Sequence, residues 1–557
     1  MLTARRLYLY VVSGIALALL AVGAAALLRL TLERVMGSQP ALAGGSDADQ
    51  LAVGLALVIV GLPLFAIQWW LVERTVRGDE AAADAERRSV VRAFYFFVVL
   101  AVSLGYLASQ AVTAIDYAVR QVGGELDVWA PLIEDTLAVG AISLAIWSFH
   151  AWTRHGDVIR WPLDGAAAWL SRLYLYGAIV IGALVALGGI GIGLQATGRE
   201  LLASGSAIAV DPWIVAMAQS IALAVVGGVV WFGHRTYATR LTIAPDFRSP
   251  AERASRVRQA SLVILFATCT IVVSLAVVAS MVEALRLGLG ITASASPARL
   301  VELIGGSLIT ALPFTFAGWW TYERSIRREH DLVGPEGALS TRRAELLVVA
   351  GVGLMLSFVG IIEVVAMGLE TIIGDAPLTV GSGRLDDLAP WIAAVLVGLP
   401  MWVLAWAAVQ RSRSRDAVLE AASTARRTYL FLTIGASVAI VGVALSYIVY
   451  QLIRDLVGVE PARFGGEIAT AIGAVIVGGI ALAYHFWVLR SDLAVRSAVV
   501  VTEAPPAVES AEALPAAAQE LLVIGPPDAD FEAVDQVIRE HLPSGFSLRV
   551  MGPGHAI

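Results

Sequence analysis

The chain has 557 residues, of which 58% are apolar and 15% are charged, and its mean hydropathy is +0.76. About a quarter of the residues in a soluble domain are charged, so this composition excludes a water-soluble enzyme, and the abundance of apolar residues excludes a disordered chain. The net charge of −7 argues against a nucleic-acid-binding protein, and the single cysteine, Cys269, excludes a disulfide framework.

Twelve stretches of the chain are long and apolar enough to cross a bilayer as helices, which takes about 20 residues. Each is predicted to be a helix, because the backbone finds no water to bind within the hydrocarbon. The predicted fold class is therefore an all-α polytopic membrane protein. The twelve spans are residues 7–30, 51–72, 90–115, 131–152, 173–196, 212–233, 260–284, 300–322, 345–369, 388–409, 428–453 and 467–489.

The distribution of arginine predicts the orientation of these spans. The N-terminus, the connections from even to odd spans and the segment after the last span hold 28 arginines, whereas the opposite connections hold 9. Positively charged loops stay in the cytoplasm, so both termini are predicted to be cytoplasmic in a protein of the cell (plasma) membrane. The first apolar run is longer than the roughly 7–15 residues of a signal peptide, so no cleavage is expected.

Arginines open every odd-numbered span at intervals of 82 to 87 residues. Each interval contains one helix, an outer loop and a returning helix, which predicts six parallel two-helix repeats. Such a parallel arrangement differs from the inverted repeats of many transporters. The opening arginines are Arg6, Arg88, Arg172, Arg256, Arg343 and Arg427.

Three returning helices carry a proline followed six residues later by a tryptophan. Proline bends a membrane helix, and tryptophan close to arginine favours the headgroup depth. The preferred interpretation is an interfacial structural signature, and kinked helices that line a cavity are the alternative. Two of the pairs lie 250 residues apart, which suggests two membrane halves, residues 1–240 and 241–496. The pairs are Pro63 and Trp69, Pro313 and Trp319, and Pro400 and Trp406.

The start of the repeat carries a resemblance to a known family. Residues 5–10 read RRLYLY and residues 171–176 read SRLYLY. A long helix that opens in this way, in a repeated multi-span unit, resembles the prokaryotic domain-of-unknown-function family 5671, present here in tandem copies. The second unit departs from the motif, reading RAFY at 92–95. The resemblance implies a membrane location but no activity, substrate or site residue.

A few polar side chains within the spans are candidates for an ion or substrate pathway. Glu363 is predicted to lie near the outer edge of the hydrocarbon, and Gln110, Gln195 and Gln451 lie at similar depths in other repeats. Ionisable groups at such positions are costly and mark function, although polar groups also hydrogen-bond helix to helix. Interhelical bonding is the preferred interpretation, and Glu363 is the best candidate for a coupled proton or ion site.

Other motifs favour structural roles. His150, His234 and His485 lack the paired spacing of metal ligands and are predicted to be interfacial. The glycines in 189–193 and at 478–479 predict close helix packing, and with no strand before them they do not indicate a dinucleotide site. The chain is not predicted to be an enzyme, and no catalytic residue, metal or cofactor is predicted.

The composition changes after the last span. Residues 497–519 are rich in Ala, Pro and Glu, which predicts a flexible linker. Residues 520–557 then follow a strand–helix–strand pattern, which predicts a small cytoplasmic segment that docks on the membrane domain or on a partner.

Two functions of different class follow. The first is a transporter or channel-like protein for a small solute or ion, favoured by twelve spans in two related halves. The alternative is a non-transporting scaffold or subunit of a membrane complex, bound to another membrane protein or to itself. It is favoured by the scarcity of charge at the midplane. The lipid bilayer is a partner in both.

Overall fold

The computed structural model describes residues 2–36, 47–77, 80–124, 133–160, 163–203, 213–246, 248–291, 297–333, 335–373, 382–458 and 466–503. The chain up to Leu493 forms one compact unit, and residues from Ala494 form a second, of which only the end of the last helix is described.

The expected C-terminal segment, 520–557, lies outside the described residues, as does most of the expected linker. Residues 497–503 were predicted to belong to the linker but continue the last helix to Glu503 instead. The sequence contains no helix breaker until Pro505 and Pro506, and the residue before a proline disfavours helical geometry. The first seven residues of the predicted linker are therefore helical.

Within the described ranges the chain forms fifteen helices and no strand. Each predicted span falls on one long helix, apart from residues 131, 132 and 212, which lie outside the described residues. The long helices are α1 (Leu2–Met36), α2 (Asp47–Val76), α4 (Val90–Val122), α5 (Ile133–Arg160), α6 (Gly165–Ala203), α7 (Trp213–Thr242), α9 (Arg256–Gly288), α10 (Pro297–Val333), α11 (Pro335–Ile373), α12 (Ser382–Arg415), α14 (Thr424–Leu456) and α15 (Gly466–Glu503). The short helices are α3 (Glu80–Arg87), α8 (Arg248–Arg253) and α13 (Ala417–Ala422).

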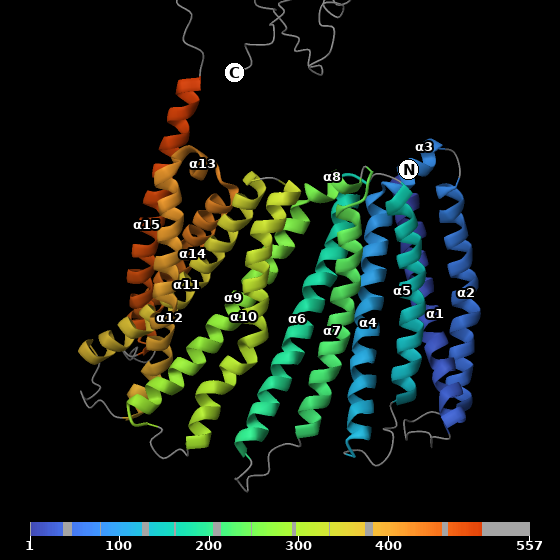
Figure 1. The fold of residues 1–557 in the computed structure, drawn as a ribbon, viewed down its shortest axis with the longest axis horizontal. Coiled ribbons are helices and arrows are strands. Elements are labelled where there is room, and N and C mark those ends of the chain that lie inside the picture. Colours follow the sequence, from blue (N-terminus) through green and yellow to red (C-terminus); the bar gives the residue numbers. More distant parts are fainter. Residues whose placement is uncertain are drawn as a thin grey trace, which may run out of the picture. The chain divides into compact units, whose positions relative to one another are not determined.

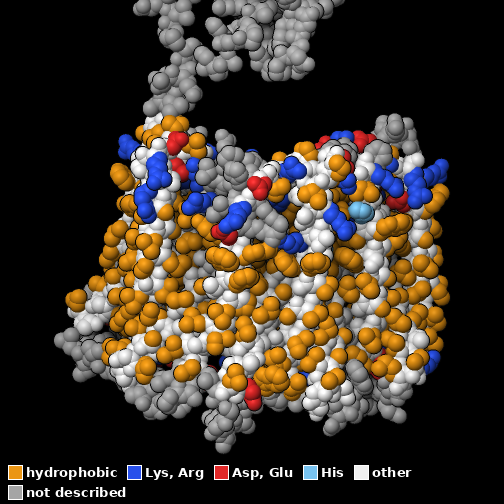
Figure 2. All heavy atoms as spheres, viewed as in Figure 1, with side chains coloured by type: hydrophobic (Ala, Val, Ile, Leu, Met, Phe, Trp, Pro, Cys, Tyr) orange, Lys and Arg blue, Asp and Glu red, His pale blue; other side chains and the backbone are white. Residues whose placement is uncertain are grey.

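Eleven of the described helices are long and apolar enough to cross a membrane, and α10 is the long helix outside that set. The chain is therefore a helical multi-pass membrane protein, as predicted. Figure 2 shows a broad band of hydrophobic side chains, with blue arginines gathered at one end of the helices. We call this the arginine-rich end; it is the end at which α4, α6, α9 and α14 begin.

Consecutive long helices pack in pairs, α1 with α2, α4 with α5, α6 with α7, α9 with α10 and α11 with α12. Neighbouring pairs contact one another in chain order, through α1 with α4 and α5, α4 with α6 and α7, and α6 with α9 and α10 (Figure 1). The three short helices follow α2, α7 and α12 at the arginine-rich end. The long helices thus fall into groups of four, with a short helix in the middle of each group.

Glycines bring the two helices of three pairs into backbone contact. An added Cβ would lie 2.8 Å from the backbone nitrogen of Leu20 for Gly61, 2.4 Å from that of Ala186 for Gly227, and 2.6 Å from that of Ser357 for Gly398. Such distances leave no room for a side chain, which is how small residues stabilise membrane helix pairs.

The close packing predicted from the glycine-rich motifs is confirmed at four of their five glycines, including Gly193, which packs against the Ser220 side chain. An added Cβ would lie 2.5 Å from a backbone atom of the neighbouring helix at Gly189 and 2.6 Å at Gly191, and 2.7 Å from a side chain at Gly478. Gly479 faces open space instead.

We expect Gly227→Ala to destabilise the protein by about 1–3 kcal/mol, because the methyl group would overlap the α6 backbone. Alanine is a better helix former than glycine by about 1 kcal/mol. A loss of stability would therefore come from the overlap with α6 and not from helix propensity. The matched control is Gly228→Ala, whose Cβ meets nothing within 4 Å. Thermal unfolding of the detergent-purified chain measures both. Equal loss in the two variants would contradict this account.

Candidate functional site

The polar residues predicted to mark a pathway lie on four different helices. Gln110 lies against Gly140 of α5, and Gln195 against Gly306 of α10. Gln451 is buried, and its Nε2 donates a hydrogen bond to the Tyr447 hydroxyl at 2.6 Å. Glu363 on α11 is partly exposed. Among the described residues, no hydrogen bond or ion pair joins any two of these four side chains, so the structure does not bring them into one site.

The three proline–tryptophan pairs lie within helices but in different surroundings. Trp319 is 60% exposed, as expected for an interfacial anchor. Trp406 is 4% exposed, and its Nε1 donates a hydrogen bond to the Tyr484 hydroxyl at 2.6 Å. Trp69 packs on the His150 ring, with centroids 5.6 Å apart. The Trp406 ring therefore packs between helices, whereas Trp319 faces outward.

Two buried arginines form ion pairs across neighbouring helices near the arginine-rich end. Arg92 of α4 is fully buried and donates to the Asp157 carboxylate of α5 from Nη2 at 2.9 Å and from Nε at 3.1 Å. Arg426 of α14 is also fully buried, and its Nε lies 2.7 Å from Asp492 of α15. A buried charge is tolerated only when it is paired and hydrogen-bonded, so these contacts fix how each pair of helices meets.

Two histidines lie beside these ion pairs. We call the eight residues the buried layer: Arg92, Tyr95, His150 and Asp157 in α4 and α5, and Arg426, Tyr429, His485 and Asp492 in α14 and α15. His150 Nε2 lies 3.1 Å from the Tyr95 hydroxyl and His150 Nδ1 lies 2.8 Å from the Ile146 carbonyl oxygen. His485 makes the corresponding contacts with Tyr429 and with the Ala481 carbonyl. Both histidines are 1% exposed, so they are buried between helices, and both ring nitrogens of each have a hydrogen-bond partner. Their interfacial depth stays a prediction.

Sequence reasoning missed this layer although the sequence contains a signal for it. In α4 and α5, Arg92 is followed by Tyr95 after 3 residues, His150 after 58 and Asp157 after 65. In α14 and α15, Arg426 is followed by Tyr429, His485 and Asp492 after 3, 59 and 66 residues. The recurrence of four polar residue types at matching spacing identifies the layer without a structure.

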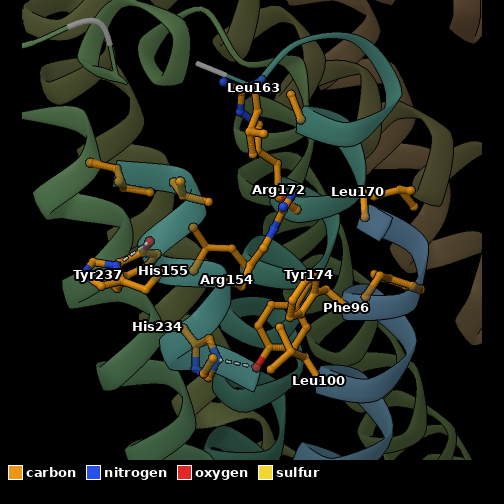
Figure 3. Close-up of a pocket in the computed structure, with 18 of the residues that line it drawn as sticks. Phe96, Leu100, Arg154, His155, Leu163, Leu170, Arg172, Tyr174, His234 and Tyr237 are labelled. Atoms are coloured by element: carbon orange, nitrogen blue, oxygen red, sulfur yellow. Dashed lines mark hydrogen bonds between the residues drawn. The ribbon is translucent and has the colours of Figure 1, made fainter. Parts of the chain in front are cut away.

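A cavity of about 610 Å³ lies between the pairs α4–α5 and α6–α7 near the arginine-rich end. Its inner wall is apolar and includes Phe96, Leu100, Trp147 and Leu175. In Figure 3, Arg154 and Arg172 lie between Leu163 at one end of the cavity lining and Phe96 and Leu100 at the other. Concave sites with apolar walls and a few convergent polar groups are typical binding sites for small molecules.

Arginine dominates the charge of the cavity lining, with Arg154, Arg172, Arg240 and Arg248 against the single acid Glu252. Arg172 Nε lies 2.9 Å from Glu252, which neutralises that arginine. Arg248 binds Asp246, and its hydrogen bonds hold the pKa of the Asp246 carboxyl below its usual value. Asp246 therefore stays ionised and offsets Arg248.

Arg154 is the buried cation of the cavity. It is 6% exposed, and its Nη2 donates to the Ser171 hydroxyl at 2.5 Å. Its Nη1 lies 3.6 Å from Asp157 and makes no hydrogen bond. Arg92 and Arg154 share Asp157, and Glu73 lies 3.6 Å from Arg92 Nη2, so two carboxylates stand against the two buried arginines.

The model of the family described as Domain of unknown function (DUF5671) matches three segments of the chain, residues 6–122, 172–316 and 343–480. The chain belongs to this family. The resemblance read from the RRLYLY motif is thus confirmed, with three tandem DUF5671 copies. The predicted boundary between halves, at residue 240, falls inside the second copy. No curated protein and no solved structure matches the chain.

The three DUF5671 copies share an ion pair that involves their first arginine. Each of these arginines, near the start of α1, α6 or α11, binds a glutamate on the short helix in the same copy. The pairs are Arg6 with Glu86 at 2.7 Å, Arg172 with Glu252 at 2.9 Å and Arg343 with Glu420 at 2.7 Å. In the first two copies a tyrosine, Tyr10 or Tyr176, donates to the same glutamate. These contacts attach the short helices to the membrane bundle.

We expect Asp157→Asn to cost about 3–5 kcal/mol of stability, because it leaves Arg92 and Arg154 buried without their carboxylate. Asp84→Asn is the control, since its pair with Arg88 is exposed and worth about 0–1 kcal/mol. Denaturant unfolding in detergent measures both. A cost below 1 kcal/mol for Asp157→Asn would show that the buried pair does not hold α4 to α5.

Proposed function

We propose that the DUF5671 protein crosses the cell membrane twelve times with both termini in the cytoplasm. The 18 residues from Leu303 to Trp320 of α10 contain no charged side chain, which is long enough for a further span beside the eleven candidates. The excess of arginine in the connections at one end supports a cytoplasmic arginine-rich end, because positive loops are retained inside.

Cysteine labelling tests this topology. In a Cys269→Ser background, a cysteine replacing Val122, at the far end of α4, is expected to react with a membrane-impermeant maleimide in intact cells. A cysteine replacing Ala254, between α8 and α9, is expected to react only after the membrane is permeabilised. Both native side chains are exposed. Reaction of both positions from the same side would disprove the topology.

We further propose that the protein transports a small anionic solute taken up from the arginine-rich face. The observation that carries this proposal is the cavity between α4, α5, α6 and α7, where arginines converge above an apolar wall. Its lining reaches Leu100, roughly 15 Å along α4 at 1.5 Å per residue, which is about half of the hydrocarbon thickness of roughly 30 Å. A chamber that reaches this far into the bundle is what a transporter with its binding site near the midplane requires.

Uptake into proteoliposomes tests the transport proposal. The full chain is reconstituted, and the entry of radiolabelled inorganic phosphate, succinate and octanesulfonate is compared with that into protein-free vesicles. At least one anion is expected to enter at least five times faster with the protein. Gly233→Leu, which fills the cavity, is expected to abolish this difference, whereas Gly228→Leu on the same helix is expected to preserve it. Both glycines have open space around an added Cβ.

Absence of uptake for all three anions would contradict the transport proposal. It would favour the alternative function, a non-transporting scaffold or subunit of a membrane complex, for which the helical bundle serves as a framework. Co-purification of a stoichiometric membrane protein in mild detergent is the expected result for that alternative.

A further inference from the structure

We infer that the second DUF5671 copy binds one acyl chain of a bilayer phospholipid in a cavity within that copy. This second-copy cavity has a volume of about 480 Å³ and lies between the pairs α6–α7 and α9–α10. It is lined by other residues than the cavity between α4, α5, α6 and α7. The inference therefore goes beyond the proposed function and does not depend on it.

Two features place equivalent positions of the three copies in register. The glutamate of each short helix is followed six residues later by an arginine, namely Arg92 after Glu86, Arg258 after Glu252 and Arg426 after Glu420. A glycine of the second long helix meets the first long helix 14 residues after the first arginine of the copy. These glycines are Gly61, Gly227 and Gly398. The other positions of each copy can be counted from these arginines and glycines.

In the first and third copies, three aromatic rings fill the space between the two helix pairs. All three rings of a copy contact one another, with centroids 5.6 to 6.3 Å apart in the first copy and 5.2 to 6.0 Å apart in the third. Such separations are typical of aromatic contacts. The rings are Trp69, Tyr95 and His150 in the first copy and Trp406, Tyr429 and His485 in the third.

The second copy has other residues at these three positions. Arg235 stands at the position of the tryptophan, eight residues after the glycine, and Ser261 stands at that of the tyrosine, three residues after the arginine. The histidine follows the arginine after 58 or 59 residues, and the second copy has Phe316 and Ala317 there. All four residues line the second-copy cavity. The cavity therefore lies where the other two copies have their aromatic rings.

The shape and lining of the second-copy cavity suit an alkyl chain. Along α6 the lining runs from Tyr176 to Ile190, which is roughly 21 Å at 1.5 Å per residue and about two-thirds of the hydrocarbon thickness of roughly 30 Å. The α6 residues between them that line the cavity are all aliphatic, namely Ile179, Val180, Ala183, Ala186 and Leu187. A long apolar space accommodates a linear chain better than a compact or polar solute.

The polar side chains of the lining are engaged by the protein itself. The serine and threonine hydroxyls each donate to a carbonyl oxygen of their own helix, at Thr239, Thr242, Ser261 and Thr321. Arg235 stacks on two tryptophan rings, at 5.3 and 5.0 Å from their centroids, and Arg258 Nη2 donates to a backbone carbonyl oxygen at 3.0 Å. Recognition therefore depends on the alkyl chain and not on a head group.

The position of the cavity in the bundle identifies the bilayer as the source of the chain. Ile190 and Phe316 line the cavity and are 44% and 64% exposed, and exposed apolar residues within a membrane span contact lipid. Water gains few hydrogen bonds in an apolar cavity, and an empty cavity forfeits the dispersion contacts of its walls. A lipid chain that enters between Ile190 and Phe316 restores those contacts.

Photolabelling of the full chain tests this site. The protein is reconstituted in phosphatidylcholine nanodiscs that contain a trace of phosphatidylcholine with a diazirine at the end of one acyl chain, and the labelled residues are mapped by mass spectrometry. We expect label on Val180, which lines the cavity and is 8% exposed, and on Ile59 of α2, which is 67% exposed and reports contact with bulk lipid. Label on Ile59 without label on Val180 would show that no chain enters the cavity.

Three variants locate the labelled chain. Gly228→Leu, which fills the second-copy cavity, is expected to lower the label on Val180 at least fivefold and to leave that on Ile59 within twofold. Gly233→Leu, its matched control in the other cavity, is expected to change neither. Ser261→Tyr restores the residue of the other copies and is expected to act as Gly228→Leu does. If Ser261→Tyr does not fold, the glycine variants decide. Retention of the Val180 label in Gly228→Leu, or its loss in Gly233→Leu, would overturn the assignment.

Two further probes test the class of ligand. The same diazirine chain on phosphatidylglycerol is expected to label Val180 within twofold of the phosphatidylcholine probe, because the chain is what the cavity recognises. A tenfold preference for phosphatidylglycerol would instead indicate an anionic head-group site and contradict the inference. Unlabelled palmitic acid, equimolar with the probe, is expected to leave the label within twofold. Loss of the label would assign the cavity to a free fatty acid and exclude the phospholipid.

Discussion

Pairing of buried arginine with carboxylate is the interaction on which this membrane bundle depends. Arg92 and Arg426 are fully buried, and each binds an aspartate on the next long helix. Leaving such a charge without a partner costs several kcal/mol, so helices that carry one half of a pair must meet the helix that carries the other. The same constraint connects Arg6, Arg172 and Arg343 with the short helices. All of these pairs lie at the arginine-rich end of the bundle.

The remaining packing uses glycine contacts within helix pairs and aromatic contacts between helix pairs. Within the helix pairs, glycines such as Gly227 allow backbones to touch. Between pairs, larger side chains such as Trp147 and Tyr174 meet, and the two described cavities lie there. A tight pair is a rigid unit, and the boundary between two such units is where a ligand can be accommodated or where movement can occur. The candidate site lies at such a boundary, between the pairs α4–α5 and α6–α7.

Much of the fold could be predicted from sequence because membrane helices obey a simple rule of length and apolarity. Within the described residues every predicted span falls on one long helix, and the RRLYLY motif led to the correct family. The site could not be predicted in the same way. Glu363, Gln110, Gln195 and Gln451 were selected by depth along the helix axis, which says nothing about the direction each side chain faces. The cavity instead uses Arg154, which by sequence is one of many arginines near a loop.

The sequence by itself determined the helical class, the positions of the spans, the accumulation of arginine at one end and the glycines that pack closely, because each follows from local composition or spacing. Only the tertiary structure decided which of those arginines are buried, which carboxylates they share, and that Trp406, His150 and His485 lie inside the bundle. These outcomes depend on contacts between helices far apart in sequence, such as α1 with α5 and α4 with α7. Helix rotation and pairing set those contacts, and neither is encoded in the hydropathy of a single span.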